Sequence, residues 1–348
     1  MQAYISNPLL PLNTSTPIPS IMKLIFISIL LLSASLCLSA QRRRPTTDFT
    51  TDTLFVHDPV MAYEGGLYHV FSTGNGLQHA TSRDLKHWTV HARPAIGNIP
   101  AWTHDTVPGF KNHVWAPDII KYRNRWWMAY SCSTFGKNTS AIGLLSTDRL
   151  DTDSIRWRDE GPLVCSREKR NNWNAIDPAF IIDDDNRPWL VFGSFWDGIQ
   201  LVELDSTMHI KQPAHQTTIA RRYTGGVENP VEAPFIFRHN GWYYLFVSWD
   251  YCCRGMESTY RVVVGRSRNV SGPYLDRRGV DMAQGGGTPV IKGDKRQYEA
   301  AGHSAAYHFG GKDYFVCHGY NMAFNGASTL ILREMTWSKD DWPMVVGE

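Results

Sequence analysis

One local pattern recurs five times along this 348-residue chain. In each copy a short apolar segment reaches a turn of glycine, asparagine or aspartate, and a second segment rich in β-branched and aromatic residues follows. Two such runs separated by a tight turn are typical of a β-hairpin, so each copy predicts a pair of antiparallel strands. The copies begin at Asp58-Pro59, Ala116-Pro117, Asp177-Pro178, Ala233-Pro234 and Gly302-His303.

The spacing of the copies predicts how the hairpins assemble. They recur roughly every 60 residues, and a third strand-like segment follows each hairpin, as at 141–145. A repeat of this length built from short antiparallel strands is typical of a propeller blade, and the sequence contains no long amphipathic helical stretch. We therefore predict an all-β fold, a five-bladed β-propeller with a central active-site channel, in a single domain from 45 to 348.

The amino-terminal segment is typical of an export signal. Met22-Lys23 precedes an apolar run over 24–38, and Ser39-Ala40 then supplies the small residues that a signal peptidase prefers. The run is shorter than the roughly 20 residues that span a bilayer. We interpret 22–40 as a signal peptide, 1–21 as translation from an upstream start codon, and the protein as secreted or periplasmic without a membrane span.

Composition and cysteine content exclude several classes of protein. A net charge of +2, with 43% hydrophobic and 20% charged residues, describes a globular chain without the basic stripe of a nucleic-acid-binding protein. Once Cys37 is removed with the signal peptide, five cysteines remain, too few to frame the fold with disulfides, and none has zinc-site spacing. The adjacent Cys252 and Cys253 form either a vicinal disulfide or two thiols. We expect a monomer.

Three carboxylates are the candidate catalytic groups. In the aligned copies, Asp58 and Asp177 occupy the same column, and Glu232 lies one residue before that column in the fourth copy. The first strand of each propeller blade lines the channel, so these side chains are predicted to converge there. Converging acids suit glycoside hydrolysis, in which one carboxylic acid protonates the leaving oxygen and one carboxylate activates water. The alternative is that Asp-Pro only initiates strand-entry turns.

The motifs around these acids resemble a known family of enzymes. His57-Asp58-Pro59, Ala175-Ile176-Asp177-Pro178 and Val231-Glu232-Ala233-Pro234 resemble glycoside hydrolase family 43, whose fold is a five-bladed propeller. The segments 133–143, 193–199 and 252–260 are similar to those of the endo-1,5-α-L-arabinanases in that family. The resemblance extends over nearly the whole chain after the signal peptide. It implies an inverting hydrolase that cleaves internal α-1,5-L-arabinofuranosidic bonds of arabinan.

The resemblance also implies roles for individual residues. Asp58 would be the general base, Glu232 the general acid, and Asp177 the residue that tunes and holds the acid. Inversion would require roughly 6.5 to 9.5 Å between the carboxyl groups of base and acid. The residues that would contact sugar are His57, Phe135 and Trp196, with Trp115 either lining the groove or packing between blades.

His303 resembles a family histidine that holds a metal ion at the centre of the channel, usually taken as calcium. Because calcium prefers oxygen ligands, His303 could instead be a hydrogen-bonding histidine of the channel. Two alternative functions stay open at this stage. One is an exo-acting α-L-arabinofuranosidase or β-xylosidase on the same fold, and the other is a carbohydrate-binding propeller without catalysis.

Overall fold

The computed structural model describes residues 46–151, 155–226 and 228–346. The predicted signal peptide and the residues before it lie outside this part of the chain. Within the described residues, strands dominate, with one short α-helix, α2 (Trp102–Thr106). Three single-turn 3₁₀ helices are η1 (Gly255–Glu257), η2 (Met282–Gln284) and η3 (Met322–Phe324). No helix in this part of the chain is long and apolar enough to cross a membrane.

The strands form five antiparallel sheets, each built mainly from one copy of the repeat. The first sheet has the order β1 (Phe49–Thr51), β6 (Trp88–Val90), β5 (Gln78–Ser82), β3 (Leu67–Ser72), β2 (Val60–Glu64). The second has the order β10 (Arg158–Ser166), β9 (Ser140–Thr147), β8 (Arg125–Cys132), β7 (His113–Tyr122), β4 (Gly74–Asn75). The third runs β11 (Ala179–Ile182), β12 (Pro188–Phe192), β13 (Ile199–Glu203), β14 (Gln216–Ala220). The fourth runs β15 (Val231–His239), β16 (Trp242–Trp249), β17 (Arg261–Ser267), β18 (Thr288–Lys292). The fifth runs β19 (Tyr298–Phe309), β20 (Lys312–Asn321), β21 (Ala327–Trp337), β22 (Pro343–Val345).

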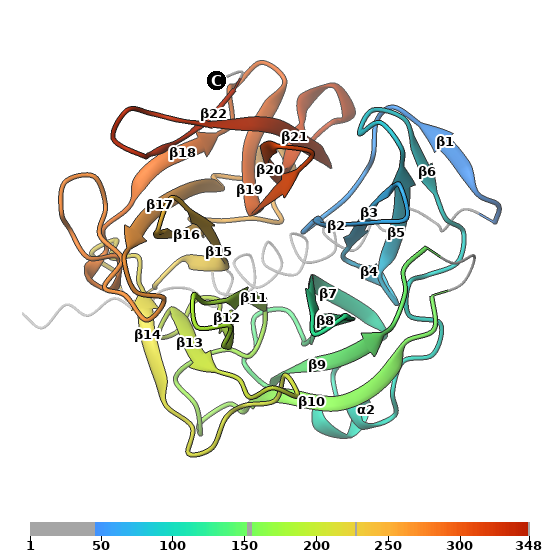
Figure 1. The fold of residues 1–348 in the computed structure, drawn as a ribbon, viewed down its shortest axis with the longest axis horizontal. Helices are drawn as coiled ribbons and strands as arrows, with labels where there is room; N and C mark the ends of the chain where they lie inside the picture. The colour runs from blue at the N-terminus through green and yellow to red at the C-terminus, as the bar shows by residue number, and fades with distance from the viewer. Residues whose placement is uncertain (1–45, 152–154, 227, 347–348) are drawn as a thin grey trace, which may run out of the picture. The chain divides into compact units, whose positions relative to one another are not determined.

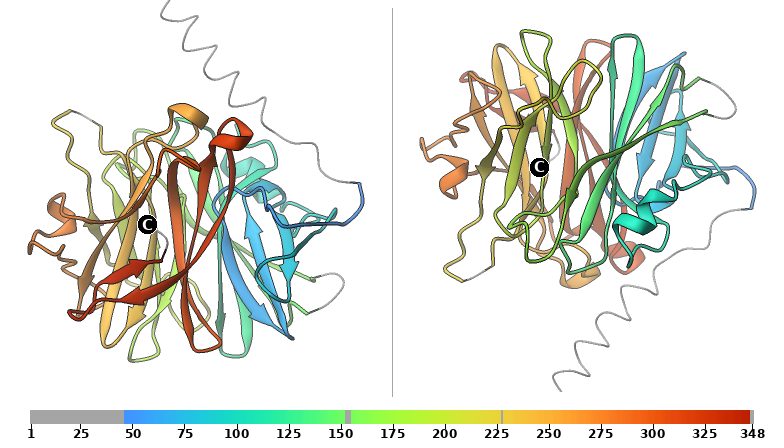
Figure 2. Two further views of the ribbon diagram at one scale, coloured as in Figure 1. Left: turned by 90° about the horizontal axis from the view of Figure 1, so that it is seen from above. Right: turned by 90° about the horizontal axis from the view of Figure 1, so that it is seen from below.

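The five sheets stand around one axis, with β2, β7, β11, β15 and β19 innermost (Figure 1). Each innermost strand contacts the next one along the chain, and β19 also contacts β2, which closes the ring. Seen from the side, the inner strands run along the axis and the connecting loops gather at its two ends (Figure 2). The prediction of a five-bladed propeller is therefore confirmed. Blades are numbered one to five in chain order below.

The predicted hairpin turns form at one end of this ring. In blade two, Arg123 and Asn124 connect β7 to β8, with φ angles of 50° and 61°. Two consecutive residues with positive φ are the pattern of the tight turns that match the twist of paired strands. Gly65-Gly66, Asn240-Gly241 and Gly310-Gly311 repeat the pattern in blades one, four and five. The opposite end of each inner strand therefore faces the other side of the ring, where the candidate acids lie.

Two of the five sheets have five strands, whereas the other three have four. β1 adds a fifth, outermost strand to blade one, and β4 leaves blade one to pair with the inner strand β7 of blade two. Neither strand is evident in the sequence, because they are only three and two residues long. β4 joins the edges of two neighbouring blades at the end of the ring where the acids lie.

Blades one and five meet without sharing a strand. The hydroxyl of Tyr307 in β19 accepts a hydrogen bond from the Met61 N–H of β2 at 3.0 Å. The Leu330 N–H of β21 donates to the carbonyl of Leu54 at 2.8 Å. Apolar packing also joins neighbouring blades, as where Trp127 of blade two lies in one buried cluster with Phe180 of blade three.

Candidate active site

Each blade places one residue in the left-handed region, on its inner strand or just before it, at the same level of the ring. These residues are Asp58, Ala116, Asp177, Ala233 and His303, with φ angles of 55°, 43°, 56°, 52° and 54°. Residues other than glycine adopt this region rarely, and Asp does so more readily than most. The alignment that placed Gly302 in this column was wrong by one residue, because the proline that follows this position in the other copies is missing in blade five. His303 therefore shares the ring position of Asp58 and Asp177.

Side chains from neighbouring blades hold the backbone N–H groups of these five residues. Four of the acceptors occupy equivalent positions, by strand pairing, at the ends of second strands. The bonds run from Asp58 N–H to His318 Nδ1 (3.1 Å), Ala116 N–H to Thr73 Oγ1 (2.9 Å), Asp177 N–H to Ser131 Oγ (3.0 Å) and His303 N–H to Ser248 Oγ (2.8 Å). In blade four, Ala233 N–H donates instead to Asp177 Oδ2 at 3.1 Å. The left-handed residues thus form a ring of cross-blade hydrogen bonds around the axis.

Asp58 is a buried carboxylate surrounded by donors. Its Oδ1 atom lies 2.8 Å from Nδ1 of His57 and 3.0 Å from Nδ1 of His303, and its Oδ2 atom accepts a 2.5 Å hydrogen bond from the Thr73 hydroxyl. Burial disfavours the charged carboxylate, but the charges of His303 and His57 outweigh it and hold the pKa of Asp58 well below its ordinary value. Asp58 is therefore ionised at neutral pH.

The histidines around Asp58 differ in protonation. Burial opposes the charged form of His57, but the charges of Asp58 and Cys253 raise the pKa of His57 well above its ordinary value. Burial and the charge of His57 lower the pKa of His318 well below its ordinary value. A neutral His318 can accept the Asp58 N–H with its Nδ1 atom, as observed. The His57 and His318 rings are stacked, with 3.9 Å between their centres.

The other two candidate acids are neighbours across blades three and four. Ser194 donates a 2.7 Å hydrogen bond to Glu232 Oε2, and Asp177 accepts the N–H of Ala233, the residue after Glu232. Burial, with the charges of Glu232 and Asp58 acting against that of His303, raises the pKa of Asp177 well above its ordinary value. Two carboxyl groups on one ring, Asp58 and Asp177, therefore have pKa values pushed in opposite directions. The ionised form is thus favoured at Asp58 and the protonated form at Asp177.

The predicted sugar contacts lie at the same end of the ring. Phe135 follows β8 and Trp196 follows β12, and these two residues are 76% and 40% exposed, unusual for large aromatic residues. His57 is part of the Asp58 cluster described above. Trp115 is half-buried in β7, next to Ala116, and its Nε1–H donates to Nδ1 of His113 at 2.9 Å.

Sequence reasoning missed four residues that bond a candidate catalytic residue: Thr73, Ser131, Ser194 and His318. Thr73 and His318 lie in one column at the ends of second strands, and Ser194 directly follows that column in blade three. The recurrence of a small residue or histidine in this column was the available signal. It is a weak signal, because serine and threonine are common near strand ends for other reasons.

The vicinal cysteines form part of the wall beside His57. Their Sγ atoms are 2.7 Å apart, and the Cys253 Sγ atom lies 3.8 Å from Nε2 of His57. The Cys253 N–H also donates to the hydroxyl of Tyr320, which lies 3.2 Å from the same histidine nitrogen. A hydrogen bond from Cys252, with the charge of His57 acting against burial, lowers the pKa of Cys253 to about 6.

The side chains near the predicted metal ligand offer mainly nitrogen. One nitrogen of His303 already faces Asp58, and the ligand atoms of His57, Asp58 and His318 lie within 4.8 Å of one another. Calcium prefers a shell of six to eight oxygens, whereas this group supplies one carboxylate among three imidazoles. The residues therefore do not fit a calcium cage built by the protein, and no step proposed below passes through a metal.

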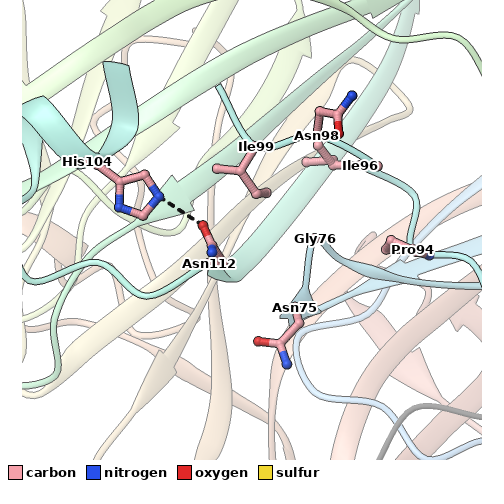
Figure 3. Close-up of a pocket in the computed structure, with 9 residues that line it drawn as sticks. Asn75, Gly76, Pro94, Ile96, Asn98, Ile99, His104 and Asn112 are labelled. Atoms are coloured by element: carbon pink, nitrogen blue, oxygen red, sulfur yellow. Dashed lines mark hydrogen bonds between the residues drawn. The ribbon is translucent and has the colours of Figure 1, made fainter. Parts of the chain in front are cut away.

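A separate hollow of about 390 Å³ lies on the surface near α2 (Figure 3). Its lining includes Asn75, Asn98, His104 and Asn112, and His104 Nε2 lies 2.9 Å from Asn112 Oδ1. Asn75 belongs to β4, two residues after Thr73. None of the three candidate acids lines this hollow, so it is not where the carboxylates act.

Comparisons with known proteins agree with this architecture. Residues 52–343 match the model of glycosyl hydrolases family 43. The chain is 44% identical over 302 residues to an extracellular exo-α-(1→5)-L-arabinofuranosidase of Cellvibrio japonicus, covering 83% of this chain and 86% of that protein. It is 40% identical over 293 residues to an extracellular endo-α-(1→5)-L-arabinanase of Bacillus subtilis, covering 83% and 87%. The crystal structure of an exo-1,5-α-L-arabinanase from a bovine ruminal metagenomic library aligns with a TM-score of 0.82 at 49% identity, covering 85% of this chain and 98% of that one. The ring of five blades, its carboxylates and these matches together show that the chain belongs to glycosyl hydrolases family 43.

Proposed function

We propose that this protein hydrolyses α-1,5-L-arabinofuranosidic bonds of arabinan with inversion at the anomeric carbon. The observation that carries the proposal is the environment of Asp58. This buried carboxylate is kept ionised by His57 and His303 on the same ring of strands that presents Glu232. Inverting hydrolysis needs an ionised carboxylate that activates water and a second carboxyl group that protonates the leaving oxygen.

In the proposed mechanism, Asp58 removes a proton from a water molecule as that water attacks the anomeric carbon. Glu232 gives its proton to the glycosidic oxygen as the bond to the leaving sugar breaks. Asp177 holds the backbone beside the acid, because its Oδ2 atom accepts the N–H of Ala233. Because the water attacks the face opposite the leaving group, an α-linked substrate gives a β-configured product.

The arabinan specificity rests on the relatives and on the exposed aromatic side chains. The two relatives from named organisms are an exo-α-(1→5)-L-arabinofuranosidase and an endo-α-(1→5)-L-arabinanase by name, and each aligns over more than four fifths of this chain. Phe135 and Trp196 offer exposed rings at the end of the ring where the carboxylates lie, which is how proteins commonly contact the apolar faces of sugars. The extracellular names of both relatives also support export of this protein.

Internal cleavage is the first candidate mode of action, because the motifs at 133–143, 193–199 and 252–260 resemble endo-acting enzymes. Release of short products from a chain end is the second candidate. It is favoured by the names of the two exo-acting proteins, at 44% and 49% identity. A β-xylosidase or a propeller that only binds carbohydrate has no comparable support.

The test uses purified protein with debranched arabinan and, separately, 4-nitrophenyl α-L-arabinofuranoside. The endo mode predicts a rapid fall in viscosity and a ladder of oligosaccharides at low conversion, whereas the exo mode predicts one short product from the start. Proton NMR during early turnover should show the β-anomer of the new reducing end first. Absence of any product from linear arabinan would refute the proposed function, and an initial α-anomer would refute inversion.

A further inference from the structure

One joint of the cross-blade ring differs from the other four, and that joint holds Glu232. By strand pairing, the second strands present five equivalent residues at this level: Thr73, Ser131, Gly193, Ser248 and His318. Four of them carry a side chain that accepts the N–H of the left-handed residue in the next blade. Gly193 carries no side chain, and the N–H of Ala233 bonds to Asp177 instead. The following residue, Ser194, donates its hydroxyl to Glu232 Oε2 at 2.7 Å.

Gly193 is fixed in this place by its backbone. Its N–H donates to the carbonyl of Ile176, the residue before Asp177, at 2.9 Å. The Thr73 N–H makes the same 2.9 Å bond to His57, the residue before Asp58, so the two positions are equivalent. Gly193 has a φ of 128°, and a Cβ there would lie 2.5 Å from a backbone carbonyl oxygen, so only glycine fits.

The chain on the other side of Ser194 is held as well. The Phe195 N–H donates to the carbonyl of Val231 at 2.9 Å, and Val231 directly precedes Glu232. Ser194 thus lies between two backbone bonds, one to Ile176 just before Asp177 and one to Val231 just before Glu232. Its hydroxyl is therefore fixed relative to both acids.

From this departure we propose, on the basis of the function proposed above, that Ser194 is a positioning residue for the general acid Glu232. Because its hydroxyl occupies Oε2, the transferable proton lies on Oε1, the oxygen left for the substrate. Both residues are buried, with 4% and 8% exposure, so the bond is protected from competition by bulk water. Thr73 acts similarly on the general base, Asp58. Its hydroxyl donates to Oδ2 of Asp58 and leaves Oδ1 to the histidines.

A positioning role for the acid predicts a dependence on the leaving group. A weakly acidic leaving group needs a proton as it departs, whereas a strongly acidic phenol leaves without one. In Ser194→Ala, we expect kcat/KM for linear arabinan and for a phenyl α-1,5-L-arabinotrioside to fall about 10- to 100-fold, mainly through kcat. For the 2,4-dinitrophenyl arabinotrioside, the fall should stay within about 3-fold. Ser194→Thr keeps the hydroxyl, so its ratio of dinitrophenyl to phenyl hydrolysis should return toward that of the wild type.

Ser146→Ala is the matched control, because Ser146 is also a buried serine whose hydroxyl donates to a glutamate, Glu160, on the outer strands of blade two. It should lower the melting temperature, as Ser194→Ala does, while the ratio of dinitrophenyl to phenyl hydrolysis stays that of the wild type. An equal loss of activity on both leaving groups in Ser194→Ala, or no loss on either, would leave the ratio unchanged and would overturn the positioning role. A wild-type protein that cleaves no arabinoside would overturn the proposed function itself, whatever Ser194 does.

Discussion

The Nδ1 atom of His303 lies 3.0 Å from Oδ1 of Asp58, and the two residues adopt the same left-handed backbone conformation in blades five and one. The closing of the ring between blades five and one therefore also assembles part of the candidate site. It brings a histidine from the carboxy-terminal blade against a carboxylate from the amino-terminal blade. The charge of that carboxylate depends on the contact, because His303 contributes to the low pKa of Asp58.

Replacing Asp58 with asparagine should abolish general-base catalysis while keeping the fold. Asn adopts the left-handed conformation of this residue readily, and it has nearly the shape of Asp. We expect kcat for arabinan to fall about 100- to 10,000-fold, the range in which a positioned general base contributes. The measurement is release of reducing sugar, together with the melting temperature. Asp105→Asn, an exposed carboxylate in α2, is the control and should retain wild-type activity, and residual activity above a tenth in Asp58→Asn would contradict the base role.

Replacing His303 with asparagine should move the acid limb of the pH profile. Asn tolerates the positive φ of this residue but carries no positive charge. Since His303 lowers the pKa of Asp58, its removal raises that pKa, and Asp58 becomes protonated at a higher pH than in the wild type. The acid limb of kcat/KM should therefore shift upward in pH. His104→Asn, which changes an exposed histidine of the surface hollow, should leave the limb where it is, and an unshifted limb in His303→Asn would refute the coupling.

The fold is predictable from the sequence because the information there is periodic. Four of the five copies carry a proline next to the left-handed residue and a turn that requires positive φ, so the blades can be counted from the residues alone. The same reliance on proline caused the error in blade five, where the column was assigned to Gly302 instead of His303. The missing proline in this copy therefore left His303, which contacts Asp58, one position away from the column of Asp58 and Asp177.

The candidate site is less predictable because the residues that contact one another there come from different blades. The contact between Cys253 and His57 joins residues far apart in the chain, and the bond from the Asp58 N–H to His318 depends on how blade five meets blade one. No local spacing encodes such contacts. Strand β4, with two residues, is also below the length at which alternation can be recognised.

Iodoacetamide should distinguish the two vicinal cysteines after reduction with a phosphine. The pKa of Cys253 is lowered to about 6 by its bond from Cys252 and the charge of His57, while that bond and burial raise the pKa of Cys252. Thiolate is the reactive form, so alkylation at neutral pH should occur at Cys253, with a rate that rises through about pH 6. Activity should fall in parallel, because the added group lies against His57. Cys253→Ser should resist this inactivation, and peptide mapping that finds Cys252 modified first would contradict the assignment.

Asp118 should make the protein less stable as the pH rises toward neutrality. Its side chain is buried, its Oδ2 atom accepts the Phe180 N–H of blade three at 2.7 Å, and burial raises its pKa to about 7. Between about pH 4 and pH 7 the folded protein holds a proton here that the unfolded chain has lost, so the free energy of unfolding falls with increasing pH across that window. A shift of about three pH units corresponds to a loss on the order of 4 kcal/mol, complete above the folded pKa.

Asp118→Asn isolates this contribution, because its amide oxygen can still accept the Phe180 N–H but does not titrate. Urea unfolding of both proteins at about pH 4.5 and about pH 8 gives two differences in the free energy of unfolding, in which the titrations common to both proteins cancel. We expect the variant to gain on the wild type by several kcal/mol between the two conditions, with most of the change falling before about pH 7. If the difference between the two proteins is the same at both pH values, Asp118 does not hold a proton at neutrality. Asp118 would then be a charged carboxylate buried between blades two and three, although burial disfavours its charged form.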